Sequence, residues 1–223
     1  MSRDQDDFQR ARRPEQKRQR ETAILEAALK LAQREGIRNI SLSDIAGEVG
    51  MHKTALLRYF ETREDIYLQL AIDAWRDWAD TLGDELRTLE PGDVPGVAEA
   101  FGRTLSERPF LCDLFTHLPL NLERNVSTTA LFGFKLAAYT GVKSLADALQ
   151  TPLPDVPEND SADLVAAVTA IAGLLWQVVH PPQAVLEIYA ENPTIAHSYN
   201  DFIATITRFT ETFILGVQAR NTR

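Results

Sequence analysis

Hydrophobic residues recur every three or four positions along nearly the whole chain, which is the period of an amphipathic α-helix. In residues 15–35, Ile24, Ala28 and Leu31 share one face, and Gly36 follows as a typical helix stop. No alternation of apolar and polar residues is long enough to require a β-strand. The pattern therefore predicts an all-α fold of about nine helices. We expect them at residues 15–35, 42–49, 52–60, 63–82 or beyond, 97–107, 110–117, 127–150, 161–180 and 194–219, with room for a short helix at 183–191.

The most apolar stretch, residues 164–179, is interrupted by Thr169 and Gln177 and is shorter than the roughly 20 residues of a membrane-spanning helix. Residues 1–20 have no apolar core of the kind that a secretory signal carries. A single cysteine, Cys112, excludes an internal disulfide and suits a reducing compartment. We therefore expect a buried helix at 164–179, no membrane contact and a cytoplasmic protein.

The net charge of −9 is distributed unevenly along the chain. Residues 1–63 hold 13 Lys and Arg against 10 Asp and Glu, whereas residues 64–223 hold 10 against 22. Residues 10–20 alone carry six basic side chains and one acidic one. This asymmetry indicates a basic region that meets a polyanion, although a solvated basic tail without a partner gives the same counts. It also suggests a basic disordered arm at 1–14, a small unit at 15–62 and an acidic helical body at 63–223.

The stretch SLSDIAGEVGMHKTALLRYF at residues 41–60 meets the requirements of a helix-turn-helix. Ala46 is small enough to stand where two helices cross, and Gly50 tolerates the positive φ of the turn. Apolar residues at positions 45, 49, 51 and 56 are spaced to hold both helices on a third. Lys53, Thr54 and Arg58 remain polar and outward on the second helix. The spacing predicts a helix-turn-helix that reads DNA, and an ordinary corner between two helices without DNA contact is the alternative.

Residues 40–70, ISLSDIAGEVGMHKTALLRYFETREDIYLQL, resemble the N-terminal domain of the TetR/AcrR family of transcriptional regulators. The similar features follow in order: a first helix that ends in a glycine, S-L-S-D-I-A, V-G-M, a Tyr-Phe pair, and T-R-E-D-I at the start of a long helix. The resemblance covers residues 18–72, and the rest of the chain is similar to the family only in length and helix count. It implies a three-helix helix-turn-helix DNA-binding domain followed by a larger helical domain for effector binding and dimerisation.

The resemblance also implies which residues meet double-stranded DNA. Hydroxyls at the start of the second helix would donate to phosphate, Lys53 and Thr54 would face base edges in the major groove, and Arg63 would contact phosphate. The expected DNA-binding residues are Ser41, Ser43, His52, Lys53, Thr54, Leu57, Arg58, Tyr59 and Arg63. The basic residues from Arg10 to Arg20 could follow the DNA backbone or enter a minor groove.

Three positions depart from the family pattern. His52 replaces a small hydroxyl residue, Thr54 stands where glycine is common, and Leu57 stands where tyrosine is common. His52 puts the customary helix cap in question, and Leu57 removes one expected hydrogen bond to phosphate. We interpret these departures as changes in operator preference rather than as loss of DNA binding.

For the acidic body the resemblance implies a homodimer and a small-molecule site. The helices near 161–180 and 194–219 would pair with their symmetry mates, and burial in the core of one chain is the alternative. A DNA-binding unit this short reads few base pairs, which favours a dimer on a palindromic operator. The candidate ligand-binding residues are Trp78, Phe115, His117, Trp176 and His180, each of which could instead be an ordinary core residue.

Motifs of the common enzyme classes are absent from the sequence. None of the four histidines, at positions 52, 117, 180 and 197, follows a glutamate by three residues, and there is no H-E-x-x-H, cysteine pair, G-x-G-x-x-G, P-loop or G-x-S-x-G. We expect no enzyme activity, no metal site and no cofactor. The sequence predicts a DNA-binding regulator, in its most specific form a homodimeric repressor released from a palindromic operator by a small, largely apolar ligand. A helical protein-interaction adaptor with a vestigial helix-turn-helix is the alternative.

Overall fold

The computed structural model describes residues 3–196 and 201–221, with side chains from residue 15 onward. Within these ranges the chain forms ten α-helices, two 3₁₀-helices and one π-helix, and no strand. The all-α fold that the hydrophobic pattern predicts is confirmed. The helices are α1 (Arg3–Glu35), η1 (Ile37–Asn39), α2 (Leu42–Val49), α3 (Lys53–Leu56), α4 (Arg63–Leu86), α5 (Val94–Ser106), α6 (Pro109–His117), η2 (Leu118–Leu122), α7 (Thr128–Leu149), α8 (Glu158–Val179), α9 (Gln183–Glu191), η3 (Pro193–Ile195) and α10 (Phe202–Asn221).

Helix α1 is longer than the sequence predicts. It begins at Arg3, whereas a disordered arm is expected up to residue 14. Arg and Gln make up half of residues 3–14 and are strong helix formers, which favours continuation of the helix. The side chains of residues 3–14 lie outside the described part, and so do the DNA contacts expected of the basic residues there.

Two other helices are shorter than predicted. α3 ends at Leu56, and the chain continues in turns in which the amides of Tyr59 and Phe60 both donate to the Leu56 carbonyl. The last helix begins at Phe202 rather than near residue 194, where η3 lies, and residues 197–200 fall outside the described ranges.

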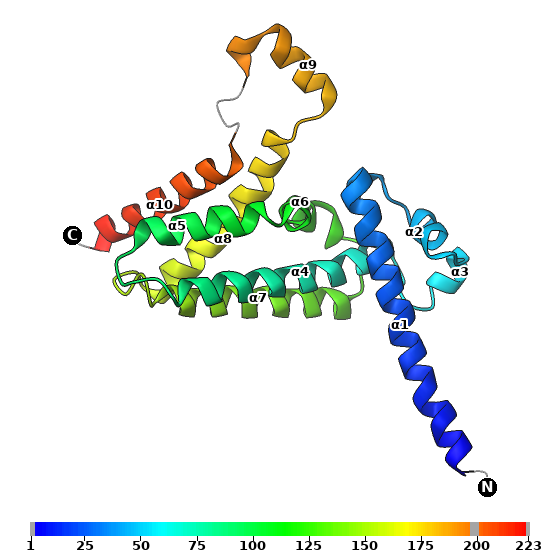
Figure 1. Cartoon of the computed structure of the whole chain (residues 1–223). Helices are drawn as coiled ribbons and strands as arrows, with labels where there is room; N and C mark the ends of the chain where they lie inside the picture. The colour runs from blue at the N-terminus through cyan, green and yellow to red at the C-terminus, as the bar shows by residue number, and fades with distance from the viewer. Residues whose placement is uncertain (1–2, 197–200, 222–223) are drawn as a thin grey trace.

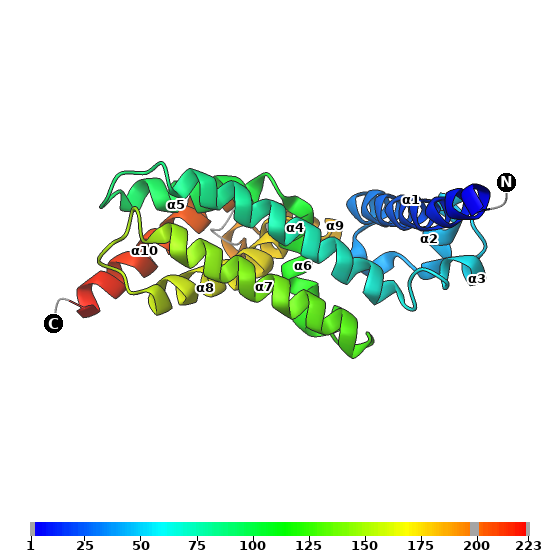
Figure 2. The same ribbon diagram turned by 90° about the horizontal axis from the view of Figure 1, so that it is seen from below.

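The helices form a small unit and a larger body, arranged end to end (Figure 1). α1, α2 and α3 make the small unit, and in the body α4 lies against α7, α5 against α10 and α6 against α8. α4 leaves the small unit and runs along the body beside α7, as Figure 2 shows from below. α9 stands out from the body between α8 and α10 and has no buried residue (Figure 1).

The small unit shares a hydrophobic core with the near end of the body. Ile24 of α1, Ile45 of α2 and Leu56 of α3 are fully buried in one cluster. The same cluster contains Leu114 of α6 and Leu122 of η2, which are also fully buried. Because protein interiors are close-packed, a shift of α6 would disturb the packing around α1.

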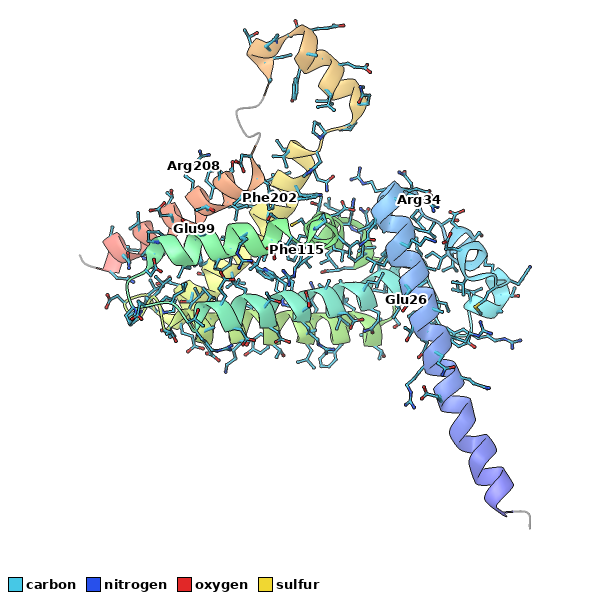
Figure 3. The ribbon with its side chains drawn as sticks, viewed as in Figure 1. Glu26, Arg34, Glu99, Phe115, Phe202 and Arg208 are labelled. Atoms are coloured by element: carbon cyan, nitrogen blue, oxygen red, sulfur yellow. The ribbon has the colours of Figure 1, made fainter. Side chains whose placement is uncertain are left out.

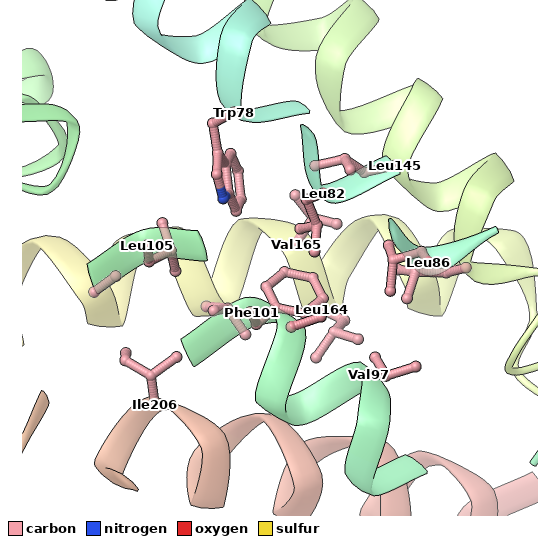
Figure 4. Packing of buried hydrophobic residues seen from close by; sticks show 14 of the residues in the cluster. Trp78, Leu82, Leu86, Val97, Phe101, Leu105, Leu145, Leu164, Val165 and Ile206 are labelled. Atoms are coloured by element: carbon pink, nitrogen blue, oxygen red, sulfur yellow. The ribbon is translucent and has the colours of Figure 1, made fainter. Parts of the chain in front are cut away.

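Aromatic side chains fill the middle of the body. Trp78 is fully buried (Figure 4), and its indole Nε1–H donates to Thr104 Oγ1 at 3.0 Å, which joins α4 to α5. Trp75 packs edge-on against Trp78 and Phe115, with ring centroids 5.7 and 5.2 Å apart. α7 approaches these rings so closely that a Cβ at Gly141 would collide with Nε1 of Trp75. Glycine is therefore required at this contact between α4 and α7.

Among the described helices, α8 alone is long and apolar enough to cross a membrane by length and composition. It packs against α6, α7 and α10, and 39% of its most apolar window is buried. The core helices of water-soluble proteins meet the same criteria. Contacts with three neighbouring helices account for part of the apolar composition of α8, whereas Ile171 and Leu174 remain exposed.

Candidate nucleic-acid interface

Helix α2 begins with a complete capping box. The Ser41 hydroxyl oxygen accepts from the Asp44 N–H at 3.3 Å, and the Asp44 carboxylate accepts from the Ser41 hydroxyl at 2.6 Å and from its N–H at 2.8 Å. The hydroxyl bond first, and the backbone bond second, lower the pKa of Asp44. The Ser43 side chain is exposed and has no partner among the described residues. Of the two hydroxyls predicted to bind phosphate, only that of Ser43 is free to donate.

The turn after α2 has the geometry that the sequence predicts. Gly50 adopts the left-handed conformation, with φ of 72° and ψ of 33°, and the Met51 N–H donates to the Ala46 carbonyl at 2.8 Å. Ala46 itself is 2% exposed, so a larger side chain there would separate the helices. These residues set the direction in which α3 leaves the corner.

Two departures from the family pattern bond to each other at the start of α3. His52 is the N-cap residue, and its Nδ1 accepts from the Thr54 N–H at 3.4 Å and lies 2.8 Å from the Thr54 hydroxyl oxygen. The imidazole therefore performs the capping role that a small hydroxyl residue performs elsewhere. Because Nδ1 accepts from the backbone, we place the ring proton on Nε2, where it remains available as a donor on an exposed side chain.

The segment from His52 to Arg58 presents polar groups and one large apolar side chain. Lys53, Thr54 and Arg58 are exposed, and Leu57 is 42% exposed. Neither Lys53 nor Arg58 has an acidic partner in the part of the chain that the structure describes. This surface can donate to base edges and phosphates, and Leu57 can contact the methyl group of a thymine.

Tyr59 is half-buried beside a polar groove of about 610 Å³ between α1 and the turns that follow α3. Lys17 and Arg20 line this groove from α1. The sequence predicts these two cations only as part of a basic run, but α1 places them opposite Tyr59. Their spacing of three residues on a helix is the sequence signal for this arrangement.

Arg63, the predicted phosphate contact at the start of α4, bonds within the chain. Its Nη1 donates to the carbonyls of Ile37 at 3.1 Å and Ile40 at 3.0 Å, and the guanidinium pairs with Glu64 at 3.0 Å. The side chain is 20% exposed. The guanidinium is thus committed to holding the link between α1 and α2 on the start of α4. A phosphate contact by Arg63 would have to replace these partners, and it stays a prediction.

The five predicted ligand-binding residues lie in three separate places. Trp78 and Phe115 belong to the aromatic core of the body, and Figure 3 shows Phe115 within it. His117 is buried where the body meets the small unit. Trp176 and His180 stack with ring centroids 4.0 Å apart beside a groove of about 480 Å³, which we name the tryptophan groove. Its lining residues are Ala32, Gln33, Gly36, Pro109, Phe110, Asp113, Trp176, Gln177 and His180.

Asp113, which belongs to no motif of the sequence, connects the body to the small unit. Its Oδ1 accepts from Gln177 Nε2 at 2.8 Å and lies 3.4 Å from His117 Nε2, and the Ile37 N–H interacts more weakly with the same carboxylate. Burial alone would raise the pKa of Asp113, but the bonds from His117, Gln177 and Ile37 outweigh burial and lower it. One carboxylate therefore joins α6, α8 and η1. Its spacing of four residues from His117 on a helix is the sequence signal that could have indicated this pair.

Solved structures share this fold at low sequence identity. A putative TetR-family transcriptional regulator from Mesorhizobium loti MAFF303099 has a TM-score of 0.55 and 14% identity over 92% of this chain and 97% of that chain. A TetR-family regulator from Streptomyces coelicolor has a TM-score of 0.53 and 16% identity over 89% and 99%. The TetR family repressor AlkX from Dietzia sp. strain DQ12-45-1b has a TM-score of 0.51 and 13% identity over 89% and 96%.

Two family models together span most of the sequence. Residues 24–70 match the bacterial regulatory proteins of the tetR family, and residues 73–221, more than half of the chain, match the tetracyclin repressor-like C-terminal domain. A search of the curated proteins finds no match. The chain therefore belongs to the TetR family of DNA-binding transcriptional regulators.

Proposed function

We propose that this protein is a homodimeric cytoplasmic repressor that binds a palindromic operator and is released by a small, largely apolar ligand. The exposed segment from His52 to Arg58 carries the proposal. Lys53 is suited to guanine O6 and N7, Thr54 and Leu57 to a thymine methyl, and Arg58 to phosphate. The groove between α1 and Tyr59 adds Lys17 and Arg20 as further phosphate contacts.

A footprint on the DNA that flanks the protein's own gene tests this proposal and gives the spacing of the half-sites. We expect two protected half-sites separated by about one helical turn of DNA, or a multiple of it. Affinity should fall steeply as salt rises, because the cations of this surface release counterions from phosphates. Equal binding to unrelated DNA, or binding that salt does not weaken, would contradict the proposal.

Lys53→Ala tests the role of the recognition segment more narrowly. Loss of a base contact should weaken operator binding by about 1–3 kcal/mol and relax sequence preference. Lys143→Ala removes the same charge from an exposed position on α7 and is the matched control. Equal loss of affinity in the two variants would indicate a general charge effect and no base reading by Lys53.

We place the dimer interface on the outer side of α8 and α10. Leu174 of α8 is 66% exposed, and Ile203 and Leu215 of α10 are 45% and 51% exposed. A narrow apolar crevice runs between the two helices. It is lined by Ala167, Val168, Ile171, Ile206, Phe209, Thr210 and Phe213. Exposed apolar side chains gathered on neighbouring helices are typical of a protein interface.

Leu174→Glu tests the proposed dimer interface. A buried unpaired carboxylate should convert the protein to a monomer in sedimentation equilibrium and weaken operator binding with it. Leu136→Glu introduces the same charge at a leucine of α7 that is 52% exposed, outside the proposed interface, and should leave the dimer intact. A dimer that survives Leu174→Glu but not Leu136→Glu would place the interface elsewhere.

We place the effector in the tryptophan groove. Its volume of about 480 Å³ is in the range of small-molecule sites, and Trp176 and Phe110 provide apolar surface while Gln177 provides a polar group. The groove is bounded by α1 of the small unit and by α6 and α8 of the body, so a ligand in it contacts both units. Ligand binding and DNA binding are then reciprocally coupled.

Nile red, an apolar fluorescent probe, tests this placement. We expect saturable binding to the full-length protein that Trp176→Ala weakens and that competes with operator DNA. Tyr139→Ala removes an aromatic ring that is 68% exposed on α7 and is the matched control. Probe binding that Trp176→Ala leaves unchanged would exclude the tryptophan groove as the apolar site.

A further inference from the structure

We propose a second site, for a small anion with a phosphate or carboxylate group, in a groove between the small unit and the body. This groove, which we name the arginine groove, has a volume of about 430 Å³. Its lining includes Ile37 and Arg38 from the small-unit side, Arg63 from the start of α4, and His117, Asn121 and Arg124 from the body beyond it. It differs in its lining from both the tryptophan groove and the groove beside Tyr59.

Two guanidinium groups at this groove lack a counterion. Arg38 and Arg124 are both exposed, and neither has a hydrogen-bond or ion-pair partner within the described ranges. Residues 64–223, which supply Arg124, hold 10 basic against 22 acidic residues. An unpaired guanidinium in this acidic region is therefore not part of a generally basic surface.

Carboxylates that could neutralise these arginines are engaged with other cations. Glu123, adjacent to Arg124 in the chain, pairs with Lys135 at 2.6 Å. Glu64, which lines the groove, pairs with Arg63 at 3.0 Å. The groove therefore keeps the positive charge of Arg38 and Arg124.

The small-unit wall of the arginine groove is held in place by bonds on both sides of Ile37. The Ile37 carbonyl accepts from Arg63 at 3.1 Å, and its N–H lies on the side of the Asp113 carboxylate, whose pKa it helps to lower. On the opposite wall His117 Nε2 lies 3.4 Å from the same carboxylate. Because Arg38 follows Ile37 directly, its backbone is positioned before a ligand arrives, which lowers the ordering cost of binding.

The chemistry of the lining selects anions. A guanidinium presents a planar fork of donors that matches a carboxylate or a phosphate group, and the side-chain amides of Asn121 and Asn125 add neutral donors. An anion held by both Arg38 and Arg124 would connect the small unit to the body. Any resulting change in DNA affinity rests on the proposed function, whereas anion binding itself does not.

The test is a titration of the full-length protein without DNA, followed by NMR chemical shifts of the Arg38 backbone amide and the Asn121 side-chain amide. One arm uses sodium phosphate and the other sodium citrate, with sodium chloride keeping the ionic strength constant. We expect saturable shifts with one anion per chain. Tighter binding of phosphate identifies a phosphorylated ligand, and tighter binding of citrate identifies a carboxylate ligand.

Variants separate this site from general screening. Arg38→Ala and Arg124→Ala should each weaken the binding at least tenfold, and Arg124→Lys should give an intermediate loss because lysine keeps the charge but not the fork. Arg87→Ala is the matched control, since Arg87 is an exposed arginine at the opposite end of α4. Shifts that rise linearly with both anions, or an equal loss in Arg87→Ala, would overturn the proposal. A normal titration in a protein that fails to bind operator would leave it standing, because no DNA is present.

Discussion

Replacing Arg63 with alanine removes three polar contacts at the start of α4. The guanidinium donates to the carbonyl oxygens of Ile37 at 3.1 Å and Ile40 at 3.0 Å and pairs with Glu64 at 3.0 Å. Ile37 and Ile40 are 1% and 2% exposed, so their carbonyls have little other access to a donor. We therefore expect Arg63→Ala to lower the stability of the fold.

The magnitude follows from the two bonds to carbonyl oxygens. A hydrogen bond to a charged group contributes about 1.5–3 kcal/mol. Arg63 is 20% exposed, and water can enter the arginine groove to replace part of the loss. The expected decrease in the free energy of unfolding is therefore about 2–4 kcal/mol, near the lower end for two such bonds. At about 2–4 °C per kcal/mol for a chain of this size, the melting temperature should fall by roughly 5–15 °C.

Thermal unfolding by circular dichroism measures this loss, and fluorescence anisotropy with operator DNA at several salt concentrations measures binding below the melting temperature. Lys53→Ala is the opposite case, because it should weaken operator binding without changing the melting temperature. Suppose instead that Arg63→Ala melts like the wild type and reduces the slope of log affinity against log salt by about one. The guanidinium would then leave its carbonyls for a phosphate in the complex, and the structural role assigned here would be refuted.

Three further predictions follow from single residues. Bonds in the folded state lower the pKa of Asp113, so its carboxylate stabilises the fold above the unfolded-state pKa of about 4, and this stabilisation is lost as pH falls through the folded-state pKa. In thermal melts from pH 7 to pH 3, the melting temperature of Asp113→Asn should therefore fall less than that of the wild type. Burial raises the pKa of the Cys112 thiol to about 12, so Ellman's reagent should label it only as fast as the protein unfolds. The rise in absorbance with time, recorded at several denaturant concentrations, gives the labelling rate to compare with the rate of unfolding. Gly50→Ala should lower the free energy of unfolding by about 1 kcal/mol, because the φ of Gly50 is 72°. Gly47→Ala, at a position in α2 where a Cβ meets open space, should raise it by a similar amount, and urea denaturation measures both changes.

The helix-turn-helix corner is predictable from the sequence because its determinants are local. The Ser41–Asp44 capping box and the left-handed Gly50 depend on residues within one helical turn of each other. Hydrophobic periodicity likewise places most helices, since one buried face is enough to specify the period. Even the His52 cap is a local event, although the sequence pattern expects a hydroxyl there.

The roles of Arg63 and Asp113 are not predictable in this way. The acceptors of Arg63 are carbonyls 26 and 23 residues away in the chain, and backbone groups leave no mark in a sequence pattern. The predicted ligand cavity differs from the structure for a related reason. Trp78 and Phe115 have the same apolar spacing whether they contact a ligand or each other, and their mutual packing is decided by helices that meet only in the folded chain.

The bonds at the junction indicate how a ligand could influence the recognition segment. η1 contacts Arg63 of α4 and Asp113 of α6, and Ser41, the N-cap of α2, follows two residues after it. A hydrogen bond does not survive a helix shift of about 1–2 Å, so a displacement of α6 must either break the Ile37–Asp113 contact or move η1 with it. In the second case α2 and α3 move as well, because α1, α2 and α3 share one core. In the proposed dimer such a movement changes the distance between two recognition segments that must match a fixed half-site spacing. Asp113 lines the tryptophan groove and His117 lines the arginine groove. A ligand in either groove can therefore displace α6 and, through η1, the recognition segment.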